Sequence, residues 1–318
     1  MKLTVLEGPA NSALANALIS FDQQFTYPLD EGRRFTIAHD GNNWQFFHAL
    51  GEAAYAIAES HDQVLGVLGA SLRHVVQPDG VNIPLLYLGD LKIAAEARGG
   101  MILLRLARSI QTRFRERVRG AFSVVMAGTS ITPTTYTGRM GIPAFLPVDT
   151  ISILWLRTSK HDEANSSTSV IRLTGSTEGL KCFDQLAAKQ FRLPHSEPAM
   201  RSIMTPQWLL ADDGSACGRI EDTLRAKRVT TNTAEDMRSA HLSCFSYRTL
   251  SDGLNVLNAA LALAATSGYP LLFVAIAPAD TAAMQAAVSH RIQSVSTATV
   301  FSTYQTLPGH WNINTAEI

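Results

Sequence analysis

The chain has 318 residues, a length that suits two domains of about 150 residues each better than one. Apolar residues make up 46% and charged residues 17%, which excludes a disordered or fibrous protein and indicates packed globular domains. Basic and acidic residues number 27 each, so the net charge gives no reason to expect nucleic acid or an anionic membrane as a partner.

The cysteines and the apolar runs indicate in which cellular compartment the protein is expected. Cys182, Cys217 and Cys244 are odd in number and far apart, so we expect free thiols in a reducing cytoplasm. The N-terminus lacks the long apolar run of a secretory signal. The apolar region 254–277 is interrupted by Thr-Ser-Gly-Tyr-Pro, which splits it into a helix and a strand. We predict a cytoplasmic protein without a membrane partner.

Three apolar runs in the first half predict an antiparallel meander. Residues 53–60 and 64–73 are separated by a polar turn and read as a hairpin, and a third run follows at 82–93. The stretch YLGDLKIAAEARGGMILLRLARSIQ (87–111) then changes from a strand pattern to an amphipathic helix, with Gly99 and Gly100 at the junction.

The elements after this helix predict a parallel crossover and a final strand. The helix ends near Arg119, and AFSVVMAG follows as a buried strand, so the helix connects neighbouring parallel strands. Thr132-Pro133 is typical of the start of a short helix, and residues 143–158 return as a strand.

The second half repeats this order. Residues 208–228 match 55–74, residues 267–285 match 119–137, and VIRLTGSTEGLKCF matches the N-terminal MKLTVLEGPANSAL. Two of these offsets are about 150 residues, which indicates a duplicated unit. We predict two domains, 1–158 and 169–318, joined through the polar segment 159–168.

The junction at Gly99 and Gly100 is a candidate anion site. The N-terminus of a helix offers free backbone N–H groups, and glycines let a phosphate approach the backbone closely. Glycines also permit a tight turn without any ligand. No G-x-x-x-x-G-K-[ST] motif is present, and the meander is not the first part of a dinucleotide-binding unit, so pyrophosphate of another cofactor is favoured.

This order of meander, glycine turn, crossover helix, strand and short helix resembles the GNAT superfamily of acyl-CoA-dependent N-acetyltransferases. The resemblance covers residues 1 to about 158. It implies an α/β (α+β) fold of two tandem GNAT-like domains, each a mixed, mostly antiparallel sheet flanked by helices, with a bulge in the fourth strand. The local pattern is similar to that of diamine acetyltransferases, through Tyr87-Leu88-Gly89-Asp90 and the following Arg98-Gly99-Gly100 turn.

The resemblance implies acetyl-CoA, or another acyl-CoA, as cosubstrate. Its pyrophosphate would lie on backbone N–H groups of the turn, and its pantetheine arm would pair with the strand edge. Met101 and Leu103 stand where the family has small residues, so the bulk either narrows the phosphate site or shifts the loop by one residue. The turn comprises Arg98, Gly99, Gly100, Met101, Ile102 and Leu103, and the edge comprises Leu91, Lys92 and Ile93.

Acyl transfer from a thioester to an amine needs a base, a polarised carbonyl and an acid for the leaving thiol. Asp90 is the candidate base or the attractor of a cationic substrate, and the alternative is a structural carboxylate. Tyr136 is the candidate acid, although the family's tyrosine falls one residue later, at Thr137 here; the alternative is packing. His39, Asp40, Trp44 and His48 lie where the superfamily lines its acceptor site, or else they belong to the core.

Other chemistries find little support. No G-x-S-x-G motif is present, and His241 and Cys244 supply only two metal ligands, so we predict no metal. Arginines between 98 and 119 form either a solvated face or a phosphate contact. The second copy places Ser251-Asp252 at the equivalent turn, where a carboxylate opposes pyrophosphate, so this copy is predicted to be degenerate.

The sequence therefore predicts an N-acetyltransferase that moves an acetyl group to an amine by direct attack in a ternary complex. The acceptor is a small-molecule amine or a peptide amine, and a homodimer is allowed. The alternative is a non-catalytic acyl-CoA-binding or regulatory protein, and a weaker third reading is a structural interaction module.

Overall fold

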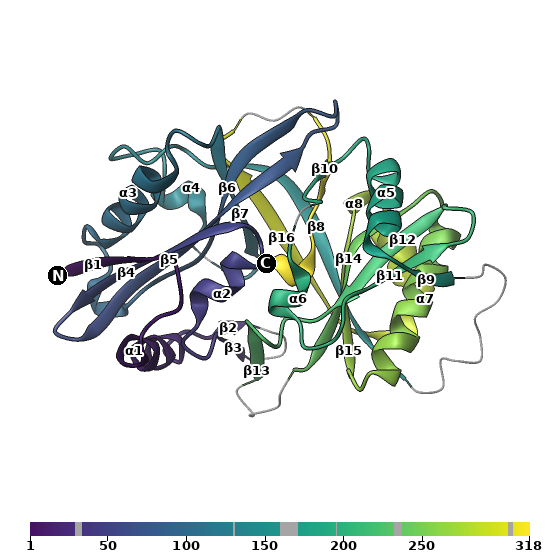
Figure 1. Ribbon diagram of the computed structural model, residues 1–318, viewed down its shortest axis with the longest axis horizontal. Helices are drawn as coiled ribbons and strands as arrows, with labels where there is room; N and C mark the ends of the chain where they lie inside the picture. The colour runs from purple at the N-terminus through teal and green to yellow at the C-terminus, as the bar shows by residue number, and fades with distance from the viewer. Residues whose placement is uncertain (29–33, 130, 160–170, 195, 232–236, 305–307) are drawn as a thin grey trace.

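The computed structural model describes residues 1–28, 34–129, 131–159, 171–194, 196–231, 237–304 and 308–318. One twisted sheet runs through the molecule and carries helices on both faces (Figure 1). The predicted α/β fold class is confirmed. The first half contains β1 (Lys2–Leu6), α1 (Ser12–Asp22), β2 (Tyr27–Pro28), β3 (Arg34–Ala38), α2 (Asn43–His48), β4 (Glu52–Ser60), β5 (Gln63–Val76), β6 (Asn82–Ile93), α3 (Ile102–Phe114), β7 (Gly120–Met126), α4 (Pro133–Tyr136) and β8 (Leu146–Arg157).

The second half repeats this order of elements. A strand and a helix lead into a hairpin, a further strand, a long helix, a parallel strand, a short helix and a final strand. Its elements are β9 (Ile171–Thr174), α5 (Ser176–Leu186), β10 (Phe191–Arg192), α6 (Pro198–Arg201), β11 (Gln207–Ala211), β12 (Ala216–Glu221), β13 (Arg228–Thr231), β14 (Ser239–Tyr247), α7 (Leu250–Thr266), β15 (Leu271–Ile276), α8 (Pro278–Ala287), β16 (Ile292–Ser302), β17 (Trp311–Asn312) and a final 3-10 turn (Thr315–Glu317).

The two copies meet through exchanged strands. The main sheet has the order β1-β4-β5-β6-β7-β16-β8-β15-β14-β12-β11-β9, which is symmetric about the β16–β8 pair. Strand β16 of the second copy lies beside β7 of the first, and β8 of the first copy lies beside β15 of the second. The segment between them, from residue 160 to 170, lies outside the described residues, so the boundary predicted within 159–168 stays a prediction.

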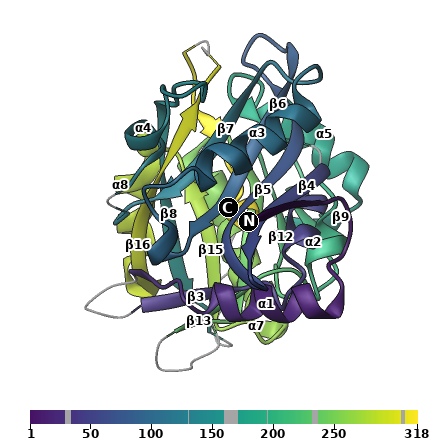
Figure 2. The same cartoon turned by 90° about the vertical axis from the view of Figure 1, so that its left-hand side faces the viewer.

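The alternation along β4 explains how helices cover both faces. Ala54, Ala56 and Ala58 pack under α3, whose Leu106 and Ile110 lie in the same apolar cluster. Their small side chains let the helix approach the sheet closely. The intervening Tyr55 and Ile57 point to the opposite face, into the cluster that α1 and α2 cover. Figure 2 shows α1 and α3 over separate parts of the sheet.

Among the described residues, no helix is long and apolar enough to cross a membrane. The apolar region around residues 254–277 divides into α7 and β15, as its turn sequence predicts.

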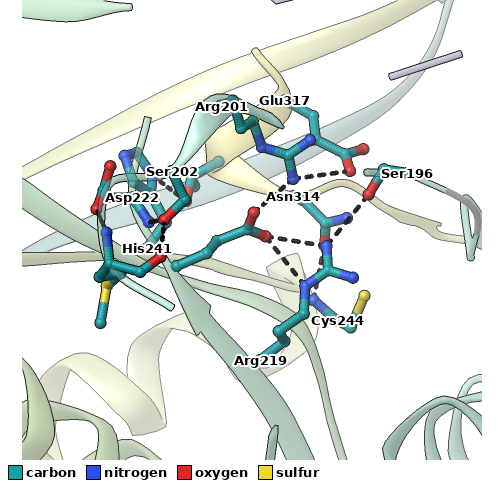
Figure 3. A network of polar contacts seen from close by, with 12 residues as sticks. Ser196, Arg201, Ser202, Arg219, Asp222, His241, Cys244, Asn314 and Glu317 are labelled. Carbon is teal, nitrogen blue, oxygen red and sulfur yellow. Dashed lines mark hydrogen bonds and ion pairs between the residues drawn. The ribbon is translucent and has the colours of Figure 1, made fainter. Parts of the chain in front are cut away.

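A buried ionic network ties the end of the chain to both copies, and Figure 3 shows the part of it around Arg201, Arg219 and Glu317. Glu317 accepts from Arg73 of β5 at 3.0 Å and from Arg201 of α6 at 3.4 Å. Arg201 also pairs with Glu221 of β12 at 2.6 Å, and Glu221 pairs with Arg219 at 3.0 Å. None of these side chains is more than 6% exposed, so water does not solvate the charges.

The charges of this network depend on one another. Burial alone would raise the pKa of Glu221 and of Glu317, but the surrounding guanidinium groups outweigh it and hold both pKa values below their usual range. Removing one member therefore leaves an uncompensated charge in the interior, where it is costly.

We predict that Arg201→Leu lowers the free energy of unfolding by about 3–5 kcal/mol, because it leaves Glu221 and Glu317 with fewer counter-charges. Urea denaturation followed by circular dichroism measures the change. The exposed Arg225 gives the matched control, since Arg225→Leu should change stability by less than about 0.5 kcal/mol. Equal effects of the two substitutions would contradict the structural role of the network.

Candidate functional site

The first copy has an opening between two parallel strands. Strand β6 pairs with β7 only at Leu85 to Tyr87, opposite Gly120 to Phe122. Beyond that point β6 continues to Ile93 and pairs only with β5, its antiparallel neighbour on the other side. The β7-facing edge of residues 88–93 is therefore available to an extended ligand, which can pair with it as a further strand would.

A bulge in β6 lies inside this opening. The register between β5 and β6 shifts between Val67 and Gly69, so β6 carries an extra residue. Asp90 takes a positive φ of 53° there, a conformation that a non-glycine residue rarely adopts. The bulge turns backbone N–H groups out of the ladder. The bulged fourth strand that the family resemblance implies is thus present.

The Gly99-Gly100 turn lies at the end of the opening and leads into α3. Gly99 has a φ of +81°, and a Cβ atom at this position would meet nothing within 4 Å. A Cβ on Gly100 would only approach the carbonyl oxygen of Ala97, at 3.6 Å. The N-cap residue of α3 is Met101, and no side chain of the described residues caps this helix. The first N–H groups of α3 are accordingly free to bind an anion.

The predicted residues at the turn occupy an exposed surface. Arg98 donates through Nε to the carbonyl of Ile93 at 3.4 Å and is otherwise exposed. Met101 is 46% exposed, so its bulk points outward. Ile102 is buried against the sheet and Leu103 is half-buried. The bulk that distinguishes this loop from the family pattern thus lies partly in the core.

Asp90 is the centre of a buried cluster of charges. Its carboxylate pairs with the Lys92 ammonium at 2.6 Å and accepts the hydroxyl of Tyr55 at 2.5 Å. Lys92 reaches on to Asp22 of α1 at 2.7 Å. Burial alone would raise the pKa of Asp90, but Lys92 outweighs it and lowers that pKa. This arrangement favours a structural and positioning role for the carboxylate over that of a strong base.

His39 faces this cluster from β3's C-terminal side. Its Nδ1 lies 2.8 Å from the carbonyl oxygen of Ala226, which can only accept, so Nδ1 carries the proton. The lone pair then lies on Nε2, 3.9 Å from Oδ2 of Asp90. Burial lowers the pKa of His39 in spite of the nearby carboxylate, so the ring is neutral. Two acceptors that face each other at this distance suit a bridging proton donor.

The remaining predicted residues lie in several places. Tyr136 ends α4, which follows the end of β7, and its burial raises the pKa of the phenol to about 12. The rings of Trp44 and His48 on α2 stack on each other, with their centroids 4.2 Å apart. Asp40 is exposed and pairs with Arg228 at 3.6 Å. Of the acceptor-site candidates, only His39 lies against Asp90.

The second copy contains the corresponding opening, and the chain's own residues occupy part of it. A cavity remains there between Phe245 to Tyr247 of β14 and Ala275 to Ala277 at the end of β15. Strands β14 and β15 pair only as far as Leu242 and Val274, and Cys244 takes a positive φ of 50° at the bulge. The residues after β17 bridge the gap. Asn314 Oδ1 accepts the N–H of Cys244 at 2.7 Å, and the Thr315 hydroxyl contacts His241 at 3.0 Å and the carbonyl oxygen of Phe273 at 3.4 Å.

The helix after this second opening is also closed to anions. Thr249 and Asp252 form a capping box on α7, so N–H groups of its first turn are already satisfied. The sequence analysis placed Ser251-Asp252 at the turn before this helix; the N-cap residue is Thr249, and Ser251 already lies inside the helix. Among the described residues, no segment is inserted beside residues 88–93 in the way that 312–315 is inserted here.

Sequence reasoning missed the partners that shape this site. Asp22 lies 70 residues before Lys92 in the chain, and Tyr55 lies 35 residues before Asp90. Lys227 comes from the second copy, contacts the carbonyl oxygen of Ile318, and has a pKa lowered to about 8 by burial and by Arg201. No local pattern marks these residues, since only the fold brings them to β6.

The described residues contain no group of three or more His, Cys, Asp or Glu side chains that could hold a metal ion. His241 contacts Thr315, and burial raises the pKa of Cys244 to about 11. Cys182, Cys217 and Cys244 are free and buried.

No protein-family model matches the sequence, and no curated protein is similar to it. Solved structures are similar in fold. Saccharomyces cerevisiae N-myristoyltransferase with bound myristoyl-CoA has 9% identity and a TM-score of 0.64, over 99% of this chain and 87% of that one. GCN5-related N-acetyltransferases from Kribbella flavida (11% identity, TM-score 0.52, 95% and 70% covered) and Anabaena variabilis (12%, 0.53, 94% and 72%) also match.

These similarities confirm the predicted GNAT-like fold. A single N-myristoyltransferase structure spans nearly the whole chain, which agrees with the repeated order of elements in the two halves. Sequence identities near 10% establish the fold alone.

We predict that His39 makes stability depend on pH. Its folded pKa lies below the value of about 6.5 expected in the unfolded chain, so the unfolded chain binds the additional proton. Stability contributed by neutral His39 is complete above about pH 6.5 and is lost as the pH falls toward the folded pKa.

The variant His39→Asn retains a donor for Ala226 but does not titrate. Its loss of stability between pH 7.5 and 5.5, measured by urea denaturation, should be smaller than that of the unmodified protein. The exposed His290 supplies the control, and His290→Asn should leave the pH dependence unchanged. An identical pH dependence in His39→Asn would refute the assignment of a neutral, buried imidazole.

Proposed function

We propose that the protein is an acyl-CoA-dependent N-acyltransferase whose first copy binds the acyl donor. The observation that carries the proposal is the unpaired edge of β6 at residues 88–93, with a bulge at Asp90 and the uncapped N-terminus of α3 at its end. An extended pantetheine arm would pair with Leu91 to Ile93, and the pyrophosphate would accept from N–H groups between Arg98 and Leu103.

The asymmetry of the two copies supports this placement. Both openings have the same architecture, but residues 312–315 bridge the second one and a carboxylate caps the helix behind it. The fold neighbours with bound myristoyl-CoA support an acyl-CoA in general. One donor per chain is therefore proposed, and the second copy would complete the wall of the acceptor site.

The surroundings of Asp90 favour a short acyl group. Asp90, Lys92 and Asp22 are buried charges directly beneath the bulge. A long alkyl chain would have to lie against them, which is unfavourable because the chain cannot solvate charge. We accordingly propose acetyl as the transferred group and a small-molecule or peptide amine as the acceptor, in the cytoplasm.

The transfer would proceed by direct attack of the neutral amine on the thioester. A backbone N–H near Leu91, turned out by the bulge, would polarise the carbonyl. The amine's proton would pass, directly or through water, to Nε2 of the neutral His39 ring, and the Asp90 carboxylate at 3.9 Å would stabilise the imidazolium that forms. Tyr136, a neutral phenol with a pKa of about 12, would protonate the leaving sulfur.

The first experiment is a calorimetric titration with acetyl-CoA. The unmodified protein should bind one equivalent per chain, and Gly100→Asp should weaken binding at least tenfold, because it adds a carboxylate beside the phosphate site. Gly100 is suited to this test because an added Cβ meets only a 3.6 Å contact. Absence of binding to any acyl-CoA by the unmodified protein would sink the proposal.

The same substitution at another helix serves as control. Gly175 is the N-cap of α5 in the second copy, and a Cβ there meets nothing within 4 Å. Gly175→Asp should leave the affinity for acetyl-CoA unchanged. Equal losses in the two variants would mean a general effect of charge, and donor binding without single-turnover transfer to any amine would favour the non-catalytic alternative.

We expect Tyr136→Phe to lower kcat roughly 100-fold, because it removes a general acid, while the affinity for acetyl-CoA stays the same. Steady-state rates with an amine found by screening measure the effect. Tyr304→Phe, at another half-buried tyrosine, should retain full activity. An unchanged kcat in Tyr136→Phe would assign Tyr136 to packing.

A further inference from the structure

The helix beside the opening carries an uneven charge. Residues 98–119 contain seven arginines and a single acidic residue, Glu116, although the whole chain has no net charge. Arg113 and Arg117 are paired with Glu7 and Glu52 of the same copy. The other five are exposed, and none of them pairs with a carboxylate among the described residues; they are Arg98, Arg105, Arg108, Arg115 and Arg119, which we term the arginine stripe.

Arg105, Arg108 and Arg115 run away from the donor opening along one side of α3 and its C-cap, and Arg119 lies between the helix and β7. At about 100° per residue, Arg108 and Arg115 lie within roughly 80° of Arg105 on the helix surface. Arg98 stands at the near end, in the turn that leads from the opening into α3. With a rise of about 1.5 Å per residue, the distance along the axis from Ile102 to Arg115 is roughly 20 Å.

This length exceeds what one nucleotide donor uses. Pyrophosphate at a helix N-terminus contacts the first turn, so it would engage Arg98 and the neighbouring N–H groups. Arg108 and Arg115 lie about two and four turns further on, beyond the reach of a pyrophosphate bound at the first turn. Exposed like charges in a row repel one another, and a surface that keeps them suits an acidic macromolecule.

We propose that an acidic carrier protein docks on the arginine stripe and delivers the acyl group on its phosphopantetheine arm. The inference rests on the proposed function, because the same opening would hold the arm. Such a carrier shares the acyl-pantetheine of coenzyme A and replaces the nucleotide with an acidic protein surface. The stripe and the opening then recognise the two parts of a single donor.

The chemistry of transfer is the same as with coenzyme A. The bond between the acyl carbon and the carrier's pantetheine sulfur breaks, and a bond between that carbon and the acceptor nitrogen forms. The nitrogen gives up one proton, the sulfur leaves as a thiol with one proton, and no oxidant or other co-reactant is needed.

A nucleic acid is less well matched to the stripe. The only aromatic residue in 98–119 is Phe114, which is fully buried, so no ring is available there for bases to stack on. A phosphate backbone would also leave the adjoining opening unused.

The test compares two donors, acetyl-CoA and an acidic acyl carrier protein with acetylated phosphopantetheine, by calorimetry at low salt. The double variant Arg108→Glu and Arg115→Glu should bind the carrier on the order of 100-fold more weakly, while its affinity for acetyl-CoA stays within about twofold. Carrier binding by the unmodified protein should weaken as salt is added. Lys181→Glu, an exposed site on α5 with half the change in charge, should affect neither donor.

The outcomes separate this inference from the proposed function. Gly100→Asp should weaken both donors, because both place a phosphate at the turn. Binding of acetyl-CoA but not of the carrier, or carrier binding that the double variant retains, would overturn the inference alone. Failure of both donors would remove the proposed function with it. A single-stranded RNA that binds in place of the carrier, and is lost in the double variant, would instead assign the stripe to nucleic acid.

Discussion

The antiparallel pairing of β16 with β8 is the constraint on which the rest of the structure depends. Its register runs from Ile292 opposite Leu156 to Ser302 opposite Leu146 and joins the last strand of each copy. Since each of these strands also borders the other copy's parallel strand, neither half completes its sheet alone. The exchange removes the exposed edges that two separate sheets would present.

This central pairing also sets the relation of the two openings. Strands β7, β16, β8 and β15 alternate in direction, so β7 and β15 run opposite to each other, and the openings beside them lie at opposite ends of the sheet. One is bridged by the chain's own residues 312–315, and the other is bounded by a glycine turn and a helix without a side-chain cap. The two copies thus have similar openings, and the C-terminal segment makes the second opening different from the first.

The buried charges are distributed in keeping with this difference. Arg73 of the first copy and Arg201 of the second, with Glu221 and Glu317, hold the C-terminal segment against β5 and β12. In the first copy, Lys92 holds Asp90 and Asp22 beneath the bulge. In each case buried ion pairs position a residue near the bulge or near the chain end. Such pairs fix the geometry of these residues more than they raise the stability of the fold.

The sequence by itself determined the order of elements, the duplication and the Gly99-Gly100 turn, because these follow from local periodicity and backbone freedom, which need only near neighbours. It also located Asp90 on the strand before that turn. Only the tertiary structure decided that the copies share one sheet, that Asp90 is neutralised by Lys92, and that residues 312–315 occupy the second opening. These contacts join residues that are far apart in the chain. The residues next to a charged side chain or an open strand edge do not indicate which distant residue will pair with it in the fold.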